Sequence, residues 1–146
     1  NCLSVMQYAV EVLKVKHIMV VGHYGCGGVQ AVLNEDRFGF IDNWLRHVGD
    51  VKEKHLEQLN ALPEKQRLDR LIELNVIEQV RNVSRTSIVQ DAWLRGQELT
   101  VHGWVYGLEN GHLHDLESVV SCAEEECTSY KKAVHHVLNK SAGSHA

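Results

Sequence analysis

The sequence has little proline, no regularly spaced cysteines and no long apolar run. Pro occurs once and Cys four times in 146 residues. No run reaches the ~18 apolar residues of a transmembrane helix, so we expect no membrane span and no membrane partner. The four cysteines are irregularly spaced and no secretory signal accompanies them. A disulfide framework is therefore not indicated, and we expect a reducing, cytoplasmic location.

The chain also lacks an excess of positive charge. It has 15 Lys and Arg residues against 19 Asp and Glu residues, which gives a net charge of −4. Because binders of nucleic acid and of anionic membranes are usually basic, we expect no nucleic-acid partner. Apolar residues make up 44% and charged residues 23% of the chain, as in an ordinary globular protein. The length suits a single domain with its own core.

The spacing of apolar residues predicts a chain of alternating helices and strands. Helical spacing is found in the segments 4–15, 29–33, 41–59, 63–83, 84–95 and 123–138. Strands are predicted over 17–22, 98–106 and 112–120. The turn signal Glu109-Asn110-Gly111 makes the last two strands antiparallel neighbours.

The fold class that these elements indicate is α/β. Strand 17–22 is apolar and rich in β-branched residues, which is typical of a parallel strand covered on both faces. The strands are few for so many covering helices. We therefore expect a mostly parallel sheet flanked by helices, with its first strands missing here. One α/β domain is expected over residues 1–138, followed by a polar tail over 139–146.

The segment that carries chemistry is the Gly-rich turn directly after the first strand. It reads His23-Tyr-Gly-Cys26-Gly27-Gly28. Imidazole nitrogen and thiolate sulfur are both good zinc ligands, and a helix beginning after the turn favours a thiolate. Since zinc takes four ligands, His23 and Cys26 are predicted to supply part of a metal site. On spacing alone, the pair fits equally well a core histidine and a buried cysteine on a turn.

This turn and its surroundings resemble the β-class carbonic anhydrases of bacterial type. The resemblance is carried by the stretch His17–Val29 with its His-x-x-Cys-Gly-Gly loop. Further segments match in order and at similar spacing over about residues 1–120. They are Asn1–Val10, Ile41-Asp-Asn-Trp-Leu45, Glu73-Leu-Asn-Val-Ile-Glu-Gln-Val80 and His102-Gly-Trp-Val-Tyr-Gly107.

The resemblance implies a zinc site, and the sequence departs from the family there. β-class enzymes hold Zn²⁺ with two Cys, one His and, in the closed state, one Asp. His23 and Cys26 match the second half of this set. The first half belongs to a Cys-x-Asp-Ser-Arg motif on an earlier strand, and the sequence contains no such motif. No catalytic residue is therefore assigned, and the chain is expected to lack the N-terminal part of the family.

Three further residues match family positions near the substrate or an effector. Gly27 would offer a backbone N–H to the substrate, and Tyr8 matches a tyrosine that lines the cleft at the subunit interface. Tyr106 resembles the tyrosine of a non-catalytic bicarbonate pocket found in part of the family. Each tyrosine also has a plainer interpretation: Tyr8 as an aromatic on an amphipathic helix, and Tyr106 as a strand-end residue with a solvated hydroxyl.

The predicted function is the zinc-dependent, reversible hydration of carbon dioxide to bicarbonate and a proton in the full-length parent. The resemblance also implies a homodimer or a dimer of dimers. An alternative is a non-catalytic fragment or paralogue with an incomplete zinc site that acts through its oligomer interface. A third possibility is a small zinc-binding module in which His23 and Cys26 are half-sites completed across a dimer.

Overall fold

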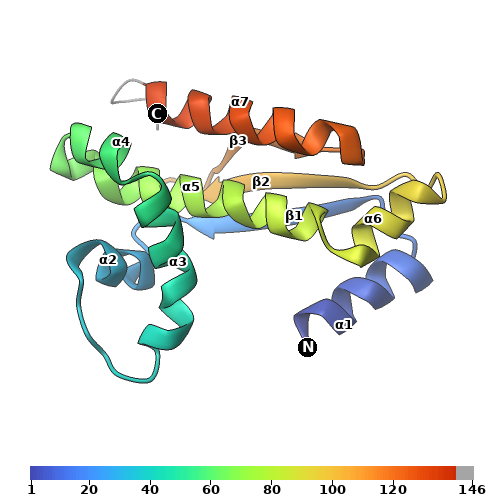
Figure 1. The fold of residues 1–146 in the computed structure, drawn as a ribbon, viewed down its shortest axis with the longest axis horizontal. Coiled ribbons are helices and arrows are strands. Elements are labelled where there is room, and N and C mark those ends of the chain that lie inside the picture. The colour runs from blue at the N-terminus through green and yellow to red at the C-terminus, as the bar shows by residue number, and fades with distance from the viewer. Residues whose placement is uncertain (141–146) are drawn as a thin grey trace.

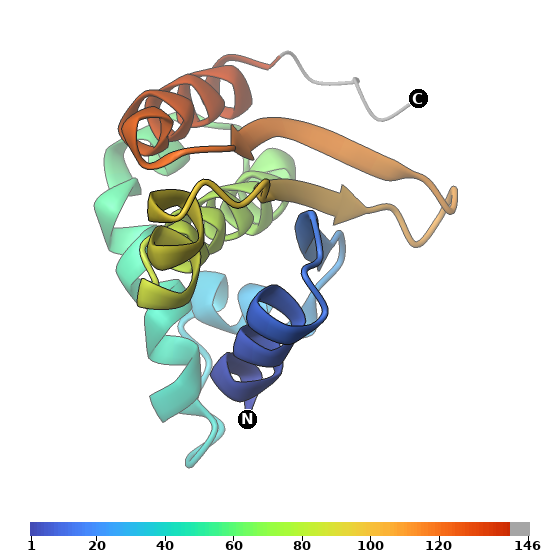
Figure 2. The ribbon, with the colours of Figure 1, turned by 90° about the vertical axis from the view of Figure 1, so that its right-hand side faces the viewer.

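The computed structural model describes residues 1–140, which form one sheet with helices packed against it (Figures 1 and 2). The strands are β1 (His17–His23), β2 (Thr100–Tyr106) and β3 (Leu113–Val120), in the order β1-β2-β3. β1 and β2 run parallel, and β2 and β3 antiparallel. The predicted α/β class and the antiparallel pair are confirmed. The sheet within this chain is mixed rather than mostly parallel, because its second connection is a tight hairpin.

The predicted helices are present with changes at their ends, except that the predicted segment 41–59 forms two helices separated at His55. The helices are α1 (Cys2–Gln7), the π-helix η1 (Tyr8–Val12), α2 (Gly27–Asn34), α3 (Asp42–Lys54), α4 (Leu56–Ala61), α5 (Glu64–Ser84), α6 (Ser87–Leu94), the 3₁₀ turn η2 (Ala123–Glu125) and α7 (Glu126–Asn139). The predicted helix 4–15 widens into π geometry, where Leu13 N–H donates to Tyr8 O. Of the predicted tail, residues 141–146 lie outside the described part. No helix in residues 1–140 is long and apolar enough to cross a bilayer.

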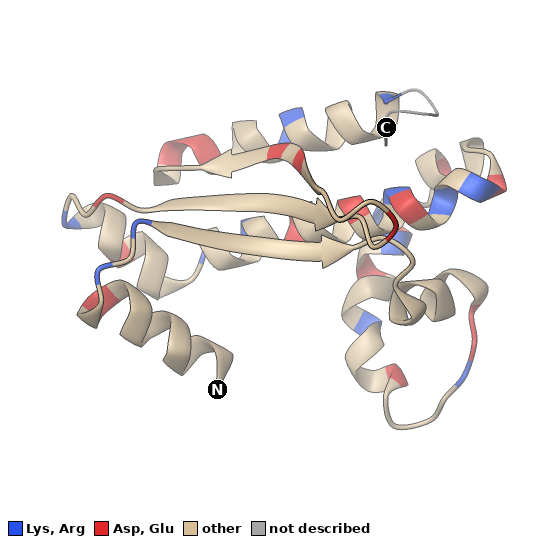
Figure 3. Cartoon of the chain, turned by 180° about the vertical axis from the view of Figure 1, so that it is seen from behind, with Lys and Arg blue, Asp and Glu red and all other residues tan. Residues whose placement is uncertain are grey.

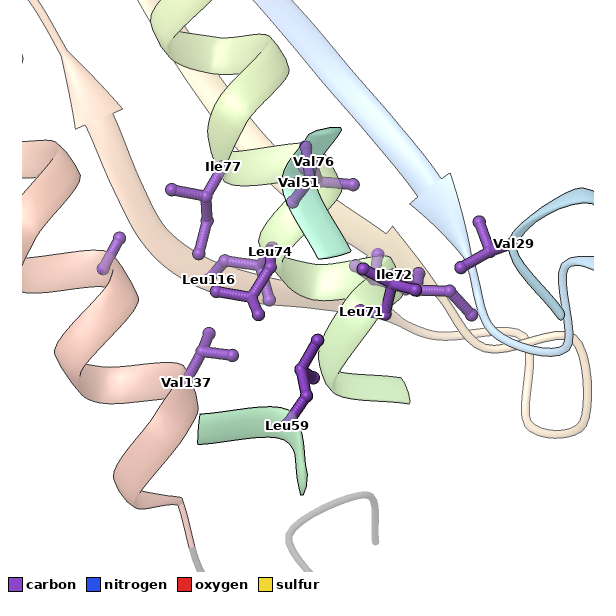
Figure 4. Close-up of a cluster of buried hydrophobic side chains, with 12 residues drawn as sticks. Val29, Val51, Leu59, Leu71, Ile72, Leu74, Val76, Ile77, Leu116 and Val137 are labelled. Atoms are coloured by element: carbon purple, nitrogen blue, oxygen red, sulfur yellow. The ribbon is translucent and has the colours of Figure 1, made fainter. Parts of the chain in front are cut away.

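The main core lies between the sheet and the helices α5 and α7, which cover the same face of it (Figure 2). α5 supplies more of the buried side chains than any other element, because its apolar residues recur at helical spacing. Figure 4 shows this cluster, in which α5 residues meet Leu116 of β3 and Val137 of α7. The buried members from α5 are Leu71, Ile72, Leu74, Val76 and Ile77.

The opposite face of β1 is open, which corrects the expectation that this strand is covered on both faces. Its residues alternate between exposed and partly buried, with Met19 58% and Val21 48% exposed. Successive side chains of a strand point to opposite faces, and α5 covers only one of them. Seen from behind, β1 and β2 have no helix in front of them and carry no Lys, Arg, Asp or Glu (Figure 3).

Two glycines let α5 approach the sheet closely. A Cβ at Gly22 of β1 would lie 2.7 Å from Val76 Cγ2. A Cβ at Gly103 of β2 would lie 2.9 Å from Val80 Cγ2 and 3.1 Å from Ser118 Cβ. Real side chains do not approach this closely, so the absence of a side chain at these positions sets the depth at which α5 packs.

We expect the substitution Gly103→Ala to destabilise the fold by about 1–3 kcal/mol, the usual effect of overpacking a dense core. Urea unfolding measures it as a lower midpoint. The control is Gly49→Ala in α3, where an added Cβ meets nothing within 4 Å. There the better helix propensity of alanine should raise stability by up to ~1 kcal/mol. Equal midpoints for the two variants would contradict the close-approach interpretation.

Candidate metal centre

The loop that joins β1 to α2 brings the predicted ligands to the carboxyl end of the strand. β1 ends at His23, and Cys26 is the residue that precedes α2. Between them Gly25 has φ +70°, a backbone conformation that glycine adopts without strain. The chain can therefore turn sharply within two residues. The carboxyl ends of strands are where open α/β sheets place their ligand sites.

His23 is held in the orientation expected of a metal ligand. Its Nδ1 lies 3.0 Å from the backbone oxygen of Tyr24, so Nδ1–H donates and Nε2 keeps its lone pair. Metal-binding histidines usually donate their second N–H in this way, which fixes the ring and its tautomer. The His23 side chain is exposed, so Nε2 is accessible.

Cys26 offers the second donor. It is a free cysteine, half-buried, at the N-terminus of α2. The thiolate is the form of cysteine that binds metal. The nitrogen and sulfur donors at this strand end fit one half of a tetrahedral zinc site. Within residues 1–140 no group of three or more His, Cys, Asp and Glu side chains could hold a metal ion, so further ligands are needed.

Two of the other predicted site residues, Gly27 and Tyr106, lie near the loop, and Tyr8 lies on a separate helical segment. Gly27 is the first residue of α2 and is exposed next to Cys26. Tyr106, the last residue of β2, is the register partner of His23, and its oxygen accepts a 3.0 Å hydrogen bond from Tyr24 N–H. Tyr8 is 57% exposed on η1, the helical segment that precedes β1 in the chain.

A buried polar network behind the loop went unrecognised in the sequence. The Tyr24 hydroxyl donates to Glu73 Oε1 at 2.7 Å, and Arg70 Nη1 donates to Glu73 Oε2 at 2.7 Å. Glu73 is 0% and Arg70 2% exposed. Both interrupt the apolar stripe of α5 at a spacing of three residues. Two opposite charges on an otherwise apolar helix face are the sequence signal that could have revealed the pair.

The network keeps Tyr24 protonated and reaches the end of α7. Burial, and next the hydrogen bond to Glu73, raise the pKa of the Tyr24 hydroxyl well above its usual range. Tyr24 is therefore a hydrogen-bond donor at any physiological pH. Arg70 Nη2 also donates to the backbone oxygen of Lys140 at 3.1 Å, and Lys140 Nζ lies 4.0 Å from Glu73 Oε1.

Fold and site together define an open-sheet α/β protein with a His-x-x-Cys loop at the end of its edge strand. The family model described as "Carbonic anhydrase" matches residues 1–113. The chain belongs to the carbonic anhydrase family, in its β class. The predicted family membership is thereby confirmed.

Both fungal and bacterial relatives support this membership. A carbonic anhydrase of Emericella nidulans is 48% identical over 117 residues, covering 80% of this chain and 51% of the relative. One of Pseudomonas aeruginosa is 35% identical, with coverage of 82% and 56%. The chain spans about half the length of the curated relatives that it matches.

Solved structures agree with the sequence comparison. The β-carbonic anhydrase of Coccomyxa, solved with acetazolamide, superposes with a TM-score of 0.81 at 35% identity. The match covers 97% of this chain and 66% of the Coccomyxa chain. A tetrameric β-carbonic anhydrase of Sordaria macrospora gives a TM-score of 0.75 at 34% identity, covering 83% of this chain and 62% of the other.

The geometry of His23 makes a prediction that needs no metal. We expect the metal-free protein at pH 8 to hold His23 as the Nδ1–H tautomer, because Nδ1 donates to the Tyr24 carbonyl. Long-range ¹H–¹⁵N correlation spectra distinguish the two ring nitrogens. An Nε2–H tautomer would contradict the proposed orientation. His135, an exposed histidine on α7, serves as the reference for an unconstrained ring.

Proposed function

We propose that the protein carrying this chain catalyses the reversible, zinc-dependent hydration of carbon dioxide to bicarbonate and a proton. The observation that carries the proposal is the loop at the end of β1, where a pre-oriented His23 and a half-buried Cys26 offer two zinc donors. Membership of the β-class carbonic anhydrase family supports the choice of metal and of reaction.

His23 and Cys26 are the residues of this chain that would hold the metal. Zn²⁺ held there would supply the charge that lowers the pKa of a coordinated water to near neutrality. His23 keeps Nε2 available through its Nδ1 hydrogen bond to Tyr24, and Cys26 contributes negative charge as a thiolate. The remaining ligands, and the Asp and Arg of the family motif, come from outside residues 1–140.

The residues beside the ligands are given roles in binding substrate and effector. The backbone N–H of Gly27 lies in the first turn of α2, where amide groups lack helical partners and favour a bicarbonate oxygen. Tyr8 lines the substrate cleft from a neighbouring subunit, which its exposure on η1 supports. Tyr106, paired with His23 across the sheet, contributes to a bicarbonate effector pocket.

The proposed assembly is a homodimer or a dimer of dimers. Large apolar side chains are exposed on α1, on η1 and directly after it, among them Leu3, Val5, Val12 and Leu13. Together with the uncharged open face of β1 and β2, they provide surface of the kind that protein interfaces bury. The proposed compartment is the cytoplasm, which the four free cysteines support.

The alternative is a non-catalytic protein with an incomplete zinc site that acts through its oligomer interface. The observation in its favour is that no third metal-binding side chain joins His23 and Cys26 among the described residues. The two functions differ in metal content and in activity, so one set of measurements separates them.

The first measurement is zinc per chain in the complete protein after dialysis against a mild chelator, followed by stopped-flow carbon dioxide hydration. We expect one zinc per chain and a rate well above that of the buffer. His23→Ala and Cys26→Ser should each abolish both, because each removes a ligand. The controls are His135→Ala and Cys127→Ser, which change exposed residues on α7.

Activity with zinc retained in the controls and lost in both ligand variants supports the enzyme. Stoichiometric zinc without hydration would favour a zinc-binding module. Absence of zinc from the complete protein would overturn the proposal and favour the non-catalytic alternative.

A further inference from the structure

Tyr24 stands between the two proposed zinc ligands and is held at three points. Its N–H donates to Tyr106 O on β2 at 3.0 Å. Its carbonyl oxygen accepts from His23 Nδ1 at 3.0 Å. Its hydroxyl reaches α5 and donates to Glu73 Oε1 at 2.7 Å. One residue thus joins the sheet, the ring of the first ligand and the helix beneath the loop.

Glu73 is the fixed end of this connection. It is fully buried, and its second carboxylate oxygen accepts from Arg70 Nη1 at 2.7 Å. A buried carboxylate that is paired with a guanidinium and receives a hydroxyl hydrogen bond has little freedom to reorient. Arg70 is itself fixed by its bond to the backbone oxygen of Lys140 at the end of α7.

The orientation of the His23 ring depends on where the Tyr24 carbonyl points. Peptide planes are rigid, so a rotation of Tyr24 would carry its carbonyl away from His23 Nδ1. Gly25, which follows, has φ +70° and offers no side chain to resist such a rotation. Three long-range contacts of Tyr24 oppose it: the N–H bond to Tyr106 O, the edge contact of its ring with His114, and the hydroxyl bond to Glu73 that anchors the far end of the side chain.

We propose that Glu73 is a positioning residue for the metal loop, the segment from His23 to Cys26 between β1 and α2. Through the Tyr24 hydroxyl, Glu73 fixes the His23 ring and its distance from Cys26. Arg70 and Lys140 hold Glu73 in place, so the end of α7 is coupled to the loop. The metal-binding consequence rests on the proposed function. The ordering of the loop does not, because it is argued only from contacts between residues of this chain.

The chain contains a matched pair of contacts that separates positioning from general stabilisation. Tyr130 of α7 donates its hydroxyl to Glu78 Oε2 at 2.9 Å, and Glu78 lies on α5 like Glu73. Both tyrosines are half-buried and both bonds end on an α5 carboxylate. Tyr130 has no part in the loop. The Tyr130 hydroxyl also lies 3.4 Å from His55 Nε2, so Tyr130→Phe removes at least as many contacts as Tyr24→Phe, but none in the loop.

The test compares these two variants in the complete protein by three measurements. They are thermal unfolding, zinc affinity by chelator competition, and hydrogen exchange of the Tyr24 amide in the metal-free protein. We expect both variants to lose similar thermal stability. Only Tyr24→Phe should weaken zinc binding, by about 10- to 100-fold as for other groups that orient metal ligands, and speed exchange of the Tyr24 amide about tenfold.

Two variants of Glu73 keep the test decisive if the loop adjusts to the loss of the tyrosine hydroxyl. Glu73→Gln retains an oxygen that can accept from the Tyr24 hydroxyl. Hydrogen exchange at the Tyr24 amide should therefore be slower in Glu73→Gln than in Glu73→Ala. If Tyr24→Phe matches Tyr130→Phe in both zinc affinity and amide exchange, the positioning role is wrong. If exchange rises while wild-type protein binds no zinc, the proposed function fails and the loop-ordering role of Glu73 stands.

Discussion

The packing of α5 against β1 and β2 is the contact on which the rest of the structure depends. Gly22 faces Val76 and Gly103 faces Val80, at distances that leave no room for a Cβ. Protein interiors are close-packed, so these two positions set how deeply the strands lie on the helix. Gly22 directly precedes His23, and the depth of packing therefore also sets where the metal loop leaves the sheet. The packing of the core and the position of the candidate site therefore depend on the same close approach of α5 to the sheet.

The charge that α5 places beneath this loop is hard to explain by stability alone. A buried ion pair such as Arg70–Glu73 is often no more stable than apolar residues of the same volume, because both charges lose their hydration. What such a pair can provide is a single, well-defined arrangement. At this position the arrangement matters, since the carboxylate is shared between a guanidinium and the Tyr24 hydroxyl. The buried charge lies where the direction of the Tyr24 side chain sets the orientation of the His23 ring.

Local sequence was sufficient for the parts of the structure that local physics decides. The β-branched run before His23 predicts β1, and Asn110-Gly111 predicts the hairpin. The placement of His23 and Cys26 at a strand end also followed from the Gly-rich turn. The open face of β1 and the link from Tyr24 to Glu73 did not follow. Periodicity does not say which face of a strand meets a helix, and Tyr24 and Glu73 are 49 positions apart in the chain.

The open edge of the sheet and the incomplete set of metal-binding side chains both belong to β1. β1 is the edge strand of the described sheet, so the backbone groups along its outer side have no strand partner there. His23 ends this same strand. Because parallel strands end at the same edge of a sheet, a parallel strand added beside β1 would place its own last side chains next to His23. A single added strand would therefore pair the backbone of β1 and also place further side chains beside the two proposed zinc ligands, so that one element would serve both the sheet and the proposed site.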